Sequence, residues 1–337
     1  MRTAVLRQVR RIEVERGAAP RPAAGEALVE LRSVGLCGSD LAAFRGHHPF
    51  RSPPVVLGHE GAGRIVRAAS AGGPAEGARV AVLPLAACRR CERCESGLAH
   101  LCPHRRVPGA GLPGLLAGRV ALPVETLVPI DDELTYDEGA LIEPAAVAWH
   151  TVRAAGVRHG SRVAVLGAGA VGALTAATAR LHGAADVLVS DVREAALTLA
   201  AYVSGCRTRR VGDVGTEDLT ESADTFDAVV VASGHPTCLD EALTLCRPRG
   251  TVIVLPMFAR PVTAALNPLV LKEIHVRGAC LYTPDDFRAA ARAVGARTLD
   301  VRPLATAEAL PLDAAQDVFE AFDGGHDTVK YRLDPSR

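Results

Sequence analysis

The chain has 337 residues, 48% of them hydrophobic, and its 38 Lys and Arg residues balance 38 Asp and Glu residues. This balance leaves no electric field that would draw a nucleic acid, and no apolar run reaches the roughly 18 residues that a membrane-spanning helix needs. We therefore expect a small-molecule partner and enough apolar residues for two domain cores. Nine cysteines and no apolar export segment favour the reducing cytoplasm, where thiols bind metal rather than form disulfides.

The first part of the chain predicts an all-β domain. It contains short apolar runs that are broken by Gly and Pro, of which residues 27–31 and 79–83 are two. Runs of this length that are rich in β-branched residues are typical of strands.

Two glycine-rich segments of this domain carry side chains that can bind metal. Cys37 lies in Val-Gly-Leu-Cys-Gly-Ser-Asp, and His59 and Glu60 lie in Leu-Gly-His-Glu-Gly-Ala-Gly. Glycines let backbone pack tightly around an ion, so these three residues are candidate ligands. A free buried cysteine and a satisfied core histidine explain Cys37 and His59 equally well, and the residues alone leave both interpretations open.

Four cysteines follow in the spacing C-x2-C-x2-C-x7-C, within a lobe at about residues 86–104. Thiolates this close in sequence converge on one tetrahedral ion at roughly 2.3 Å without help from the rest of the fold. Disulfides between such near neighbours would be strained, so the spacing favours a closed structural zinc site. Its predicted ligands are Cys88, Cys91, Cys94 and Cys102.

A carboxylate at the predicted start of a helix is the next feature. Glu143 precedes Pro144 in an otherwise apolar run, and proline suits the first turn of a helix. Negative charge at this position is favoured by about 0.3–1 kcal/mol, so an electrostatic role at the helix start would by itself account for Glu143.

A dinucleotide-binding fingerprint begins at residue 161. A β-branched strand at 161–166 runs into Gly-x-Gly-x-x-Gly, which includes Val171 as a candidate cofactor contact, and then into a helix-prone stretch at 173–181. A second strand, 186–191, ends in an acid at the distance expected of the residue that binds the adenosine ribose. The combination predicts a nucleotide-binding fold.

Each fingerprint residue has a physical role in cofactor binding. Gly167 permits the tight turn, Gly169 lets backbone approach the pyrophosphate, and Gly172 lets the helix pack on the strand. Asp191 is placed to accept hydrogen bonds from the ribose hydroxyls, which favours NAD over NADP because a 2′-phosphate would meet a carboxylate. Arg193 works against this preference, since its charge opposes that of the acid.

The remaining strands complete a predicted α/β fold with a doubly wound parallel sheet. Residues 228–232 and 251–255 are short apolar runs separated by helical residues 239–246. The tail, with 303–304 and 329–331, returns to strand-like character and should rejoin the first domain. The predicted domains are therefore 1–145, 146–280 and 281–337.

These motifs occur in the order found in zinc-dependent medium-chain dehydrogenases, which the chain resembles over essentially its whole length. The resemblance rests on Cys37-Gly-Ser-Asp, Gly-His59-Glu, the four-cysteine lobe, Glu143-Pro144 and the glycine fingerprint. It implies a GroES-like, β-rich catalytic domain, a Rossmann domain inserted before its last segment, and an active site in the cleft between them. Glu143-Pro144 resembles the polyol branch, which includes sorbitol, threonine and 2-deoxy-scyllo-inosamine dehydrogenases.

The resemblance implies two zinc ions per chain, the second at a catalytic site. Cys37 and His59 would be its ligands, with Glu60 and Glu143 completing the shell in turn with water or substrate. Successive side chains of an extended segment point to opposite faces, so His59 and Glu60 can both bind only if the chain bends there. We therefore assign His59 ahead of Glu60.

The implied chemistry is oxidation of a secondary alcohol on a polyol, sugar or aminocyclitol to a ketone, with NAD as hydride acceptor and zinc as Lewis acid. Ser39 lies two residues past a zinc ligand and is the expected hydroxyl that takes the alcohol proton toward the cofactor ribose. A turn serine that bonds its own backbone is the alternative. A homo-oligomer, either a dimer or a tetramer, is also expected.

Two departures from the family pattern affect the site. Many relatives carry a histidine where Ala42 stands, as the last member of the proton relay. Either His47 or His48 substitutes, or the proton leaves through ribose and water, and we prefer the second because both histidines fit solvated loop positions. Residues 115–119 stand where relatives have an aromatic-bearing strand, which bears on the substrate pocket.

Other functions remain open on these residues. A simple-alcohol dehydrogenase and a zinc-free quinone or enone reductase belong to the same superfamily, and the cysteine lobe with Cys37 and His59 argues against the second. A nucleotide-binding sensor that lost the chemistry belongs to another class, and Ala42 is the feature that hints at it.

Overall fold

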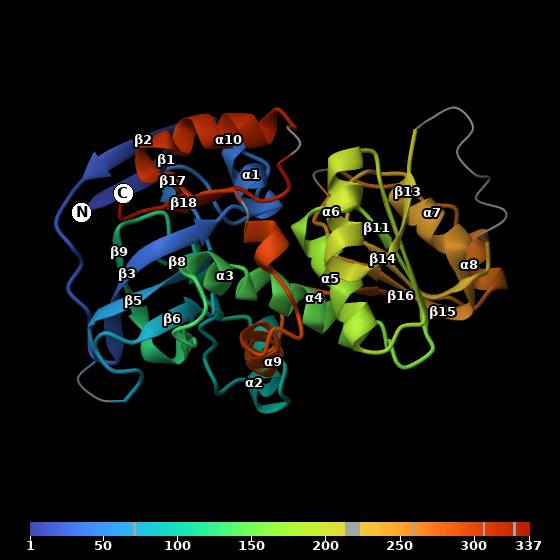
Figure 1. Ribbon diagram of the computed structural model, residues 1–337, viewed down its shortest axis with the longest axis horizontal. Coiled ribbons are helices and arrows are strands. Elements are labelled where there is room, and N and C mark those ends of the chain that lie inside the picture. The colour runs from blue at the N-terminus through green and yellow to red at the C-terminus, as the bar shows by residue number, and fades with distance from the viewer. Residues whose placement is uncertain (70–71, 213–222, 259, 306, 326–327) are drawn as a thin grey trace. The chain divides into compact units, whose positions relative to one another are not determined.

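The computed structural model describes residues 1–69, 72–212, 223–258, 260–305, 307–325 and 328–337. The chain divides into two compact units, each with its own sheets (Figure 1). Unit 1 comprises Met1–Glu143, Thr283–Gly295 and Leu304–Arg337, and unit 2 comprises Pro144–Tyr282 and Ala296–Pro303. Every helix within the described ranges is too short or too polar to cross a lipid bilayer.

A mainly antiparallel sheet forms the body of unit 1, with strand order β10-β6-β5-β3-β18-β17 and with β9 also paired to β3. A smaller sheet, β2-β1-β4, shares its hydrophobic core, which joins Leu6 of β1, Leu31 of β3 and Phe319 of α10. The strands are β1 (Arg2–Gln8), β2 (Arg11–Arg16), β3 (Glu26–Gly35), β4 (Val55–Val56), β5 (Glu60–Arg67), β6 (Arg79–Val82), β7 (Val107–Pro108), β8 (Gly111–Leu112), β9 (Arg119–Pro123), β10 (Leu127–Pro129), β17 (Leu310–Pro311) and β18 (Arg332–Asp334).

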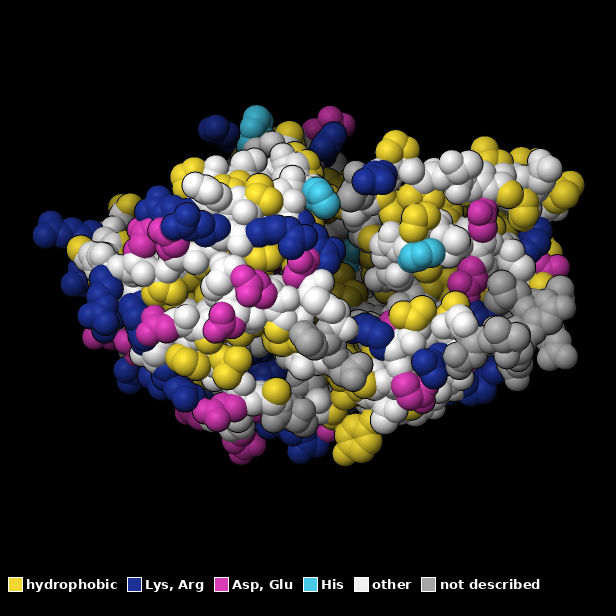
Figure 2. Space-filling model, turned by 90° about the horizontal axis from the view of Figure 1, so that it is seen from above, with side chains coloured by type: hydrophobic (Ala, Val, Ile, Leu, Met, Phe, Trp, Pro, Cys, Tyr) yellow, Lys and Arg dark blue, Asp and Glu magenta, His cyan; other side chains and the backbone are white. Residues whose placement is uncertain are grey.

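Short helices connect these strands and carry several of the candidate site residues. They are α1 (Gly38–Phe44), α2 (Glu92–Glu95), η1 (Ala99–Leu101), η2 (Val124–Thr126), α3 (Tyr136–Ala140), α9 (Pro284–Gly295), η5 (Leu312–Ala314) and α10 (Ala315–Asp323), while α4 (Ile142–Ala154) and η4 (Arg302–Ala305) cross the unit boundary. The strands expected at 27–31 and 79–83 are confirmed as parts of β3 and β6. Lys and Arg side chains are interspersed with Asp and Glu on the face shown in Figure 2, in keeping with the balanced composition.

Unit 2 contains a parallel sheet with strand order β13-β12-β11-β14-β15-β16. This is the 3-2-1-4-5-6 order of a doubly wound nucleotide-binding sheet, and it confirms the predicted α/β fold class. The valines at the centre of its strands β11 and β14 are fully buried, as expected where helices cover both faces. The elements are β11 (Arg162–Leu166), α5 (Ala170–Leu181), β12 (Asp186–Asp191), α6 (Glu194–Ser204), β13 (Arg207–Arg210), β14 (Phe226–Val231), α7 (Cys238–Leu245), β15 (Cys246–Val254), α8 (Asn267–Leu271) and β16 (His275–Gly278).

The tail of the chain is more helical than the sequence suggested. The expectation of strand character at 303–304 is wrong, because these residues lie in the 3-10 helix η4, and residues 329–331 precede β18. In α9 the buried residues Phe287, Ala290 and Val294 recur at helical spacing, so that one face packs while the other stays polar.

Candidate active site and metal centres

The four-cysteine lobe forms a compact thiol cluster around α2 and η1. The sulfur atoms of Cys91 and Cys94 are 3.5 Å apart, those of Cys91 and Cys102 are 3.8 Å apart, and those of Cys88 and Cys94 are 4.0 Å apart. Thiolates about 2.3 Å from a tetrahedral centre are about 3.8 Å from one another, so these separations fit one zinc ion. All four cysteines are free of disulfides.

The protonation chemistry of the lobe also fits a cation. Backbone hydrogen bonds, first from Cys88, lower the pKa of Cys102 to about 6. Burial and hydrogen bonding with neighbouring thiols instead raise the pKa of Cys94 to about 12. Four thiolates in such a cluster coexist when a cation compensates their charge.

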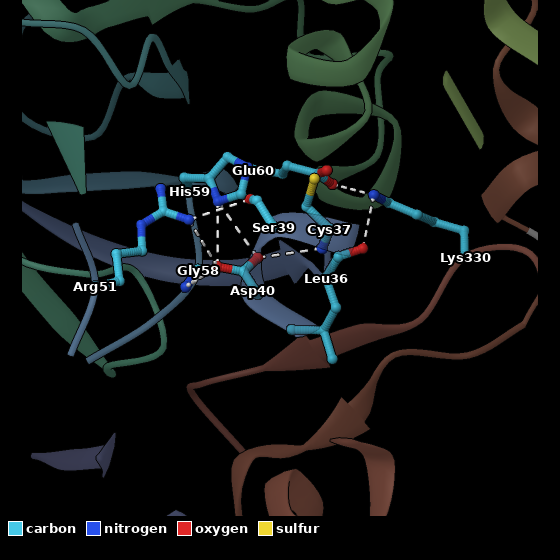
Figure 3. A network of polar contacts seen from close by, with 9 residues as sticks. All are labelled: Leu36, Cys37, Ser39, Asp40, Arg51, Gly58, His59, Glu60 and Lys330. Atoms are coloured by element: carbon cyan, nitrogen blue, oxygen red, sulfur yellow. Dashed lines mark hydrogen bonds and ion pairs between the residues drawn. The ribbon is translucent and has the colours of Figure 1, made fainter. Parts of the chain in front are cut away.

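A second group of possible metal ligands brings together Cys37, His59 and Glu60, whose ligand atoms all lie within 4.8 Å of one another. Cys37 follows the end of β3 and Glu60 begins β5, and Gly35 pairs with Glu60 across these two strands. Strand pairing therefore brings the two ligand-bearing segments together. Figure 3 shows the Cys37 sulfur beside the Glu60 carboxylate.

His59 and Glu60 contribute to the same group because the chain bends just before them. Gly58 has φ +85°, and a Cβ atom there would lie 2.9 Å from the Val34 side chain. His59 precedes β5, so the alternation of an extended strand does not apply to this pair. The preference for His59 over Glu60 thus has no geometric basis in this structure.

A fully buried carboxylate, Asp40, organises the segment around His59. Asp40 accepts hydrogen bonds from the backbone N–H of Cys37 at 3.1 Å and of Gly58 at 3.2 Å, and it lies 3.3 Å from Nδ1 of His59 (Figure 3). A donor at Nδ1 leaves Nε2 of the imidazole free to bind metal. Arg51 completes the set, with Nη1 3.4 Å from the Asp40 carboxylate.

Charge keeps Asp40 ionised despite its burial. Burial would raise the pKa of Asp40, but the charge and hydrogen bond of His59, together with Arg51, hold it well below its usual range. Burial lowers the pKa of His59, and Asp40 more than reverses this effect and raises it.

Lys330 contacts Glu60 from the far end of the chain. Its ammonium group bonds the Glu60 carboxylate and also donates to the carbonyl of Leu36 at 3.1 Å. Both side chains are almost completely buried, so the pair is protected from solvent screening. Lys330 therefore fixes the orientation of Glu60 and ties it to the residue before Cys37.

The glycines of the fingerprint have the geometry that their predicted roles require. Gly167 has φ +113°, and a Cβ atom on Gly172 would lie 1.8 Å from the Gly167 carbonyl oxygen. A Cβ atom on Gly169 would meet nothing within 4 Å, which leaves open space at the start of α5. Val171 lies in the first turn of the same helix.

Asp191 ends β12 beside this turn, and its carboxylate is already engaged. It accepts hydrogen bonds from the backbone N–H of Ala168 at 2.8 Å and of Arg193 at 2.9 Å. The Arg193 guanidinium also lies 3.3 Å from the carboxylate. Burial would raise the pKa of Asp191, but the hydrogen bonds from Arg193 and Ala168 lower it below its usual value.

Comparison with known proteins identifies the family. The alcohol dehydrogenase GroES-like domain matches residues 23–132, and the zinc-binding dehydrogenase domain matches residues 170–296. Sorbitol dehydrogenase 1 of Saccharomyces cerevisiae is 31% identical over 89% of this chain and 88% of its own length. L-galactonate-5-dehydrogenase of Escherichia coli is 34% identical over 80% of this chain and 79% of its own. The chain belongs to the zinc-dependent medium-chain alcohol dehydrogenases.

Solved structures agree with this family. A protein from Sinorhizobium meliloti, described as a zinc-binding dehydrogenase bound to NADP, is 30% identical and covers 99% of both chains with a TM-score of 0.90. The 2R,3R-butanediol dehydrogenase of Bacillus subtilis is 25% identical, again over 99% of both chains, with a TM-score of 0.89. Both parts of the predicted fold, the GroES-like domain and the Rossmann sheet, are thus confirmed for this dehydrogenase.

Glu143 of the dehydrogenase lies at the start of a helix, as predicted. It lies in the first turn of α4, is 4% exposed, and belongs to unit 1 together with Cys37, His59 and Glu60. Its role as a zinc ligand stays a prediction. The donor set of the group, a thiol, an imidazole and a carboxylate, suits a catalytic zinc site in this family.

Ser39 occupies the first turn of α1, and its hydroxyl accepts a hydrogen bond of 3.2 Å from Nη1 of Arg51. Ala42 lies in the same helix. His47 is exposed, and Nδ1 of His48 accepts a hydrogen bond from the backbone N–H of Phe50 at 3.1 Å. Burial, followed by the charge of Arg51, lowers the pKa of His48 to about 4, so this histidine is neutral at pH 7.

The segment 115–119 packs against the residues just before His59. Leu115 and Leu116 are buried, and their backbone N–H groups donate to the carbonyls of Gly58 and Leu57 at 3.0 Å each. This segment therefore packs in the core behind His59.

Sequence reasoning assigned no role to Asp40, Arg51 or Lys330. Asp40 stands three residues after Cys37, a spacing that suits a bond back to the Cys37 N–H at a helix start. Lys330 is one of two lysines in an arginine-rich chain, which was a usable signal. For Arg51 the sequence carries no signal, because its burial follows from tertiary packing.

Proposed function

We propose that the protein oxidises a secondary hydroxyl group of a polyol, sugar or aminocyclitol to a ketone, with NAD as the hydride acceptor. The observation that carries this proposal is the group of Cys37, His59 and Glu60, supported from behind by the buried Asp40. Membership of a zinc-dependent dehydrogenase family supplies the reaction class.

Each residue of the group has a part in the proposed reaction. Cys37 and His59, with Glu60 or Glu143, would hold zinc, which supplies Lewis acidity toward the substrate oxygen. Asp40 would hold the His59 ring in the tautomer that presents Nε2, and Lys330 would set the position of Glu60. Ser39 would accept the proton of the alcohol, the role predicted from its place beside Cys37.

The substrate class follows from the donor set. Carboxylate donors make a harder and more hydrated site than a second thiolate would, and such a site suits oxygens on adjacent carbons. The names of the relatives refer to sorbitol, L-galactonate and D-xylulose, and each of these carries neighbouring hydroxyl groups.

Steady-state assays test this proposal directly. We expect kcat/KM for vicinal polyols or aminocyclitols to exceed by at least about tenfold the values for ethanol, hexanol and benzyl alcohol, the equivalent of about 1.4 kcal/mol. The reverse order would indicate a simple-alcohol dehydrogenase, and activity on quinones alone would indicate a reductase. Absence of any turnover with bound zinc and cofactor would favour the sensor.

For the cofactor we propose a preference for NAD over NADP of at least about tenfold, or roughly 1.4 kcal/mol, because a 2′-phosphate would face Asp191. Arg193 reduces this effect by its contact with the same carboxylate. Asp191→Ser should bring the dissociation constants for NAD and NADP, measured by calorimetry, closer to each other. Equal affinity of the wild type for both cofactors would show that Arg193 neutralises the acid.

We further propose a homo-oligomer that forms through β16 in a reducing, cytoplasmic setting. This edge strand of unit 2 is exposed along its length and includes the exposed side chain of Val276. The exposed side chains of Val270 and Leu271 precede the strand in the sequence. The opposite edge strand, β13, carries three arginines, which discourage pairing with a second strand. Light scattering should give a dimer or tetramer, and Val276→Lys should dissociate it; a monomeric wild type would exclude the assembly.

A further inference from the structure

A buried guanidinium lies behind Ser39, and the reaction as described so far does not use it. Arg51 is 6% exposed although it precedes β4 in a loop, and its side chain points toward Ser39 and Asp40 (Figure 3). Gly109 has φ +78°, and a Cβ atom there would come within 3.2 Å of Nε of Arg51. Burying a charged group costs several kcal/mol unless hydrogen bonds and an opposite charge compensate it.

The contacts of Arg51 divide between two neighbouring residues. Its Nη1 atom donates to Oγ of Ser39 at 3.2 Å and lies 3.4 Å from the Asp40 carboxylate. Among the described residues, its Nε has no hydrogen-bond partner. One simple interpretation is that Arg51 only neutralises Asp40, which already receives hydrogen bonds from the backbone N–H groups of Cys37 and Gly58.

The contact with Ser39 has a consequence that charge compensation alone does not explain. A serine hydroxyl has one proton and two lone pairs, whereas a guanidinium donates and never accepts. With one lone pair of Ser39 occupied by Arg51, the hydroxyl keeps one lone pair to accept a proton and one proton to give away.

We propose that Arg51 is a positioning residue for proton transfer: it orients the Ser39 hydroxyl, and it stabilises the partial negative charge on Oγ when the proton of Ser39 departs ahead of the arrival of the alcohol proton. This inference rests on the proposed oxidation of a secondary alcohol. The O–H bond of the alcohol breaks and its proton forms a new bond to Oγ, while the proton of Ser39 passes to solvent, either through water or through a ribose hydroxyl that releases its own proton in turn. NAD, when bound, would accept the carbinol hydrogen as hydride with the electron pair of the C–H bond, and the ketone would remain.

Arg51→Lys tests the proposal, because lysine keeps a positive charge near Asp40, but its shorter side chain does not place a donor where Nη1 contacts both Ser39 and Asp40. We expect kcat on the best polyol to fall by about 10- to 100-fold, the scale of a misplaced proton-transfer group, with a larger solvent deuterium isotope effect. Zinc content and the dissociation constant for NAD, measured by calorimetry, should stay as in the wild type. In a Ser39→Ala background the same substitution should have no further effect on kcat.

A matched control is Arg332→Lys. Arg332 is also buried in unit 1, but its guanidinium donates to the carbonyls of Leu304 at 2.7 Å and Ala305 at 3.1 Å and lies 3.2 Å from the Asp137 carboxylate, so its partners differ from those of Arg51. This control should lower thermal stability without changing the isotope effect.

Several results would overturn the proposal. Full additivity of Arg51→Lys with Ser39→Ala, or loss of zinc from Arg51→Lys, would show that Arg51 acts through Asp40. If Arg51→Lys does not fold, Arg51→Gln, which removes the charge and is too short to reach Ser39, takes its place and should lose kcat while it keeps its zinc. Failure of both variants to fold would make Arg51 a structural residue. A wild type without activity on any polyol would instead refute the proposed function. This result is distinct from the others because it is obtained before any variant is compared.

Discussion

The two candidate zinc sites of unit 1 are assembled in different ways. The lobe takes all four thiols from residues 88–102, and the described sulfur separations fit one tetrahedral ion. The active-site group takes a thiol, an imidazole and a carboxylate from two separate segments, with Asp40 behind one ligand and Lys330 beside another. A saturated set of thiolates gives a closed site, while a mixed set of donors allows a substrate to enter the shell.

The difference shows where each site obtains its rigidity. In the lobe the ion itself would hold a short chain segment in place, so metal binding and local folding are one event. In the active-site group strand pairing and buried hydrogen bonds already fix the ligands. Metal should therefore be structural in the first site and dispensable for folding in the second.

The largest expected effect separates the two sites at the level of folding. Cys91→Ser should yield aggregated or unfolded protein, because structural zinc contributes about 10 kcal/mol or more to small domains. Cys37→Ser should fold but turn over no substrate, and it should hold one zinc where the wild type holds two. Circular dichroism and elemental analysis give both readouts, with Cys280→Ser as an exposed-cysteine control. A wild type with one zinc would contradict the assignment.

The second effect belongs to chemistry and should leave both metals in place. Ser39→Ala should lower kcat by about 10²- to 10⁴-fold, the usual range for a positioned proton-transfer group. Zinc content should not change, and Ser336→Ala, which removes a turn hydroxyl near the end of the chain, should be silent. Normal turnover by Ser39→Ala would require a different proton path.

A third effect should distinguish the sites by metal affinity. Asp40→Asn removes the charge that orients His59, and loss of such a partner weakens zinc binding by about 10- to 100-fold. Competition with a chelator should release one zinc early and retain the zinc of the lobe. Release of both ions together, or at the wild-type rate, would show that Asp40 does not support the ligand.

The smallest effect concerns the two loop histidines. His47→Ala should change kcat/KM within about twofold, since exposed substitutions alter free energies by about 0.5 kcal/mol or less. His48→Ala should be similarly mild, because its low pKa keeps it neutral. A tenfold loss of kcat/KM in either variant would show that this histidine takes part in the proton relay, in the role that a histidine at the position of Ala42 has in relatives.

The features that sequence reasoning predicted are local ones. The four cysteines and the glycines at 167, 169 and 172 act within a single turn or lobe, so their spacing in the chain already specifies their geometry. Long-range features escaped it. The bend at Gly58, which lets His59 and Glu60 face the same group, occurs where Gly58 packs closely against Val34. Arg51 is covered by Gly109, about 58 residues further along the chain. Helix α9 was not predicted, although Phe287, Ala290 and Val294 recur in it at helical spacing.

The pairing of Glu60 with Lys330 also constrains the order in which the protein can mature during synthesis. These partners are 270 residues apart, and unit 2, which ends at Pro303, leaves the ribosome before Lys330 does. Until Lys330 emerges, burial of the Glu60 carboxylate would lack its counter-ion and would be unfavourable. Unit 2 can therefore complete its fold before unit 1 does. In a series of ribosome-arrested chains of increasing length, those that stop before residue 330 should therefore already bind the cofactor. Their residues 35–60 should still be cleaved by protease.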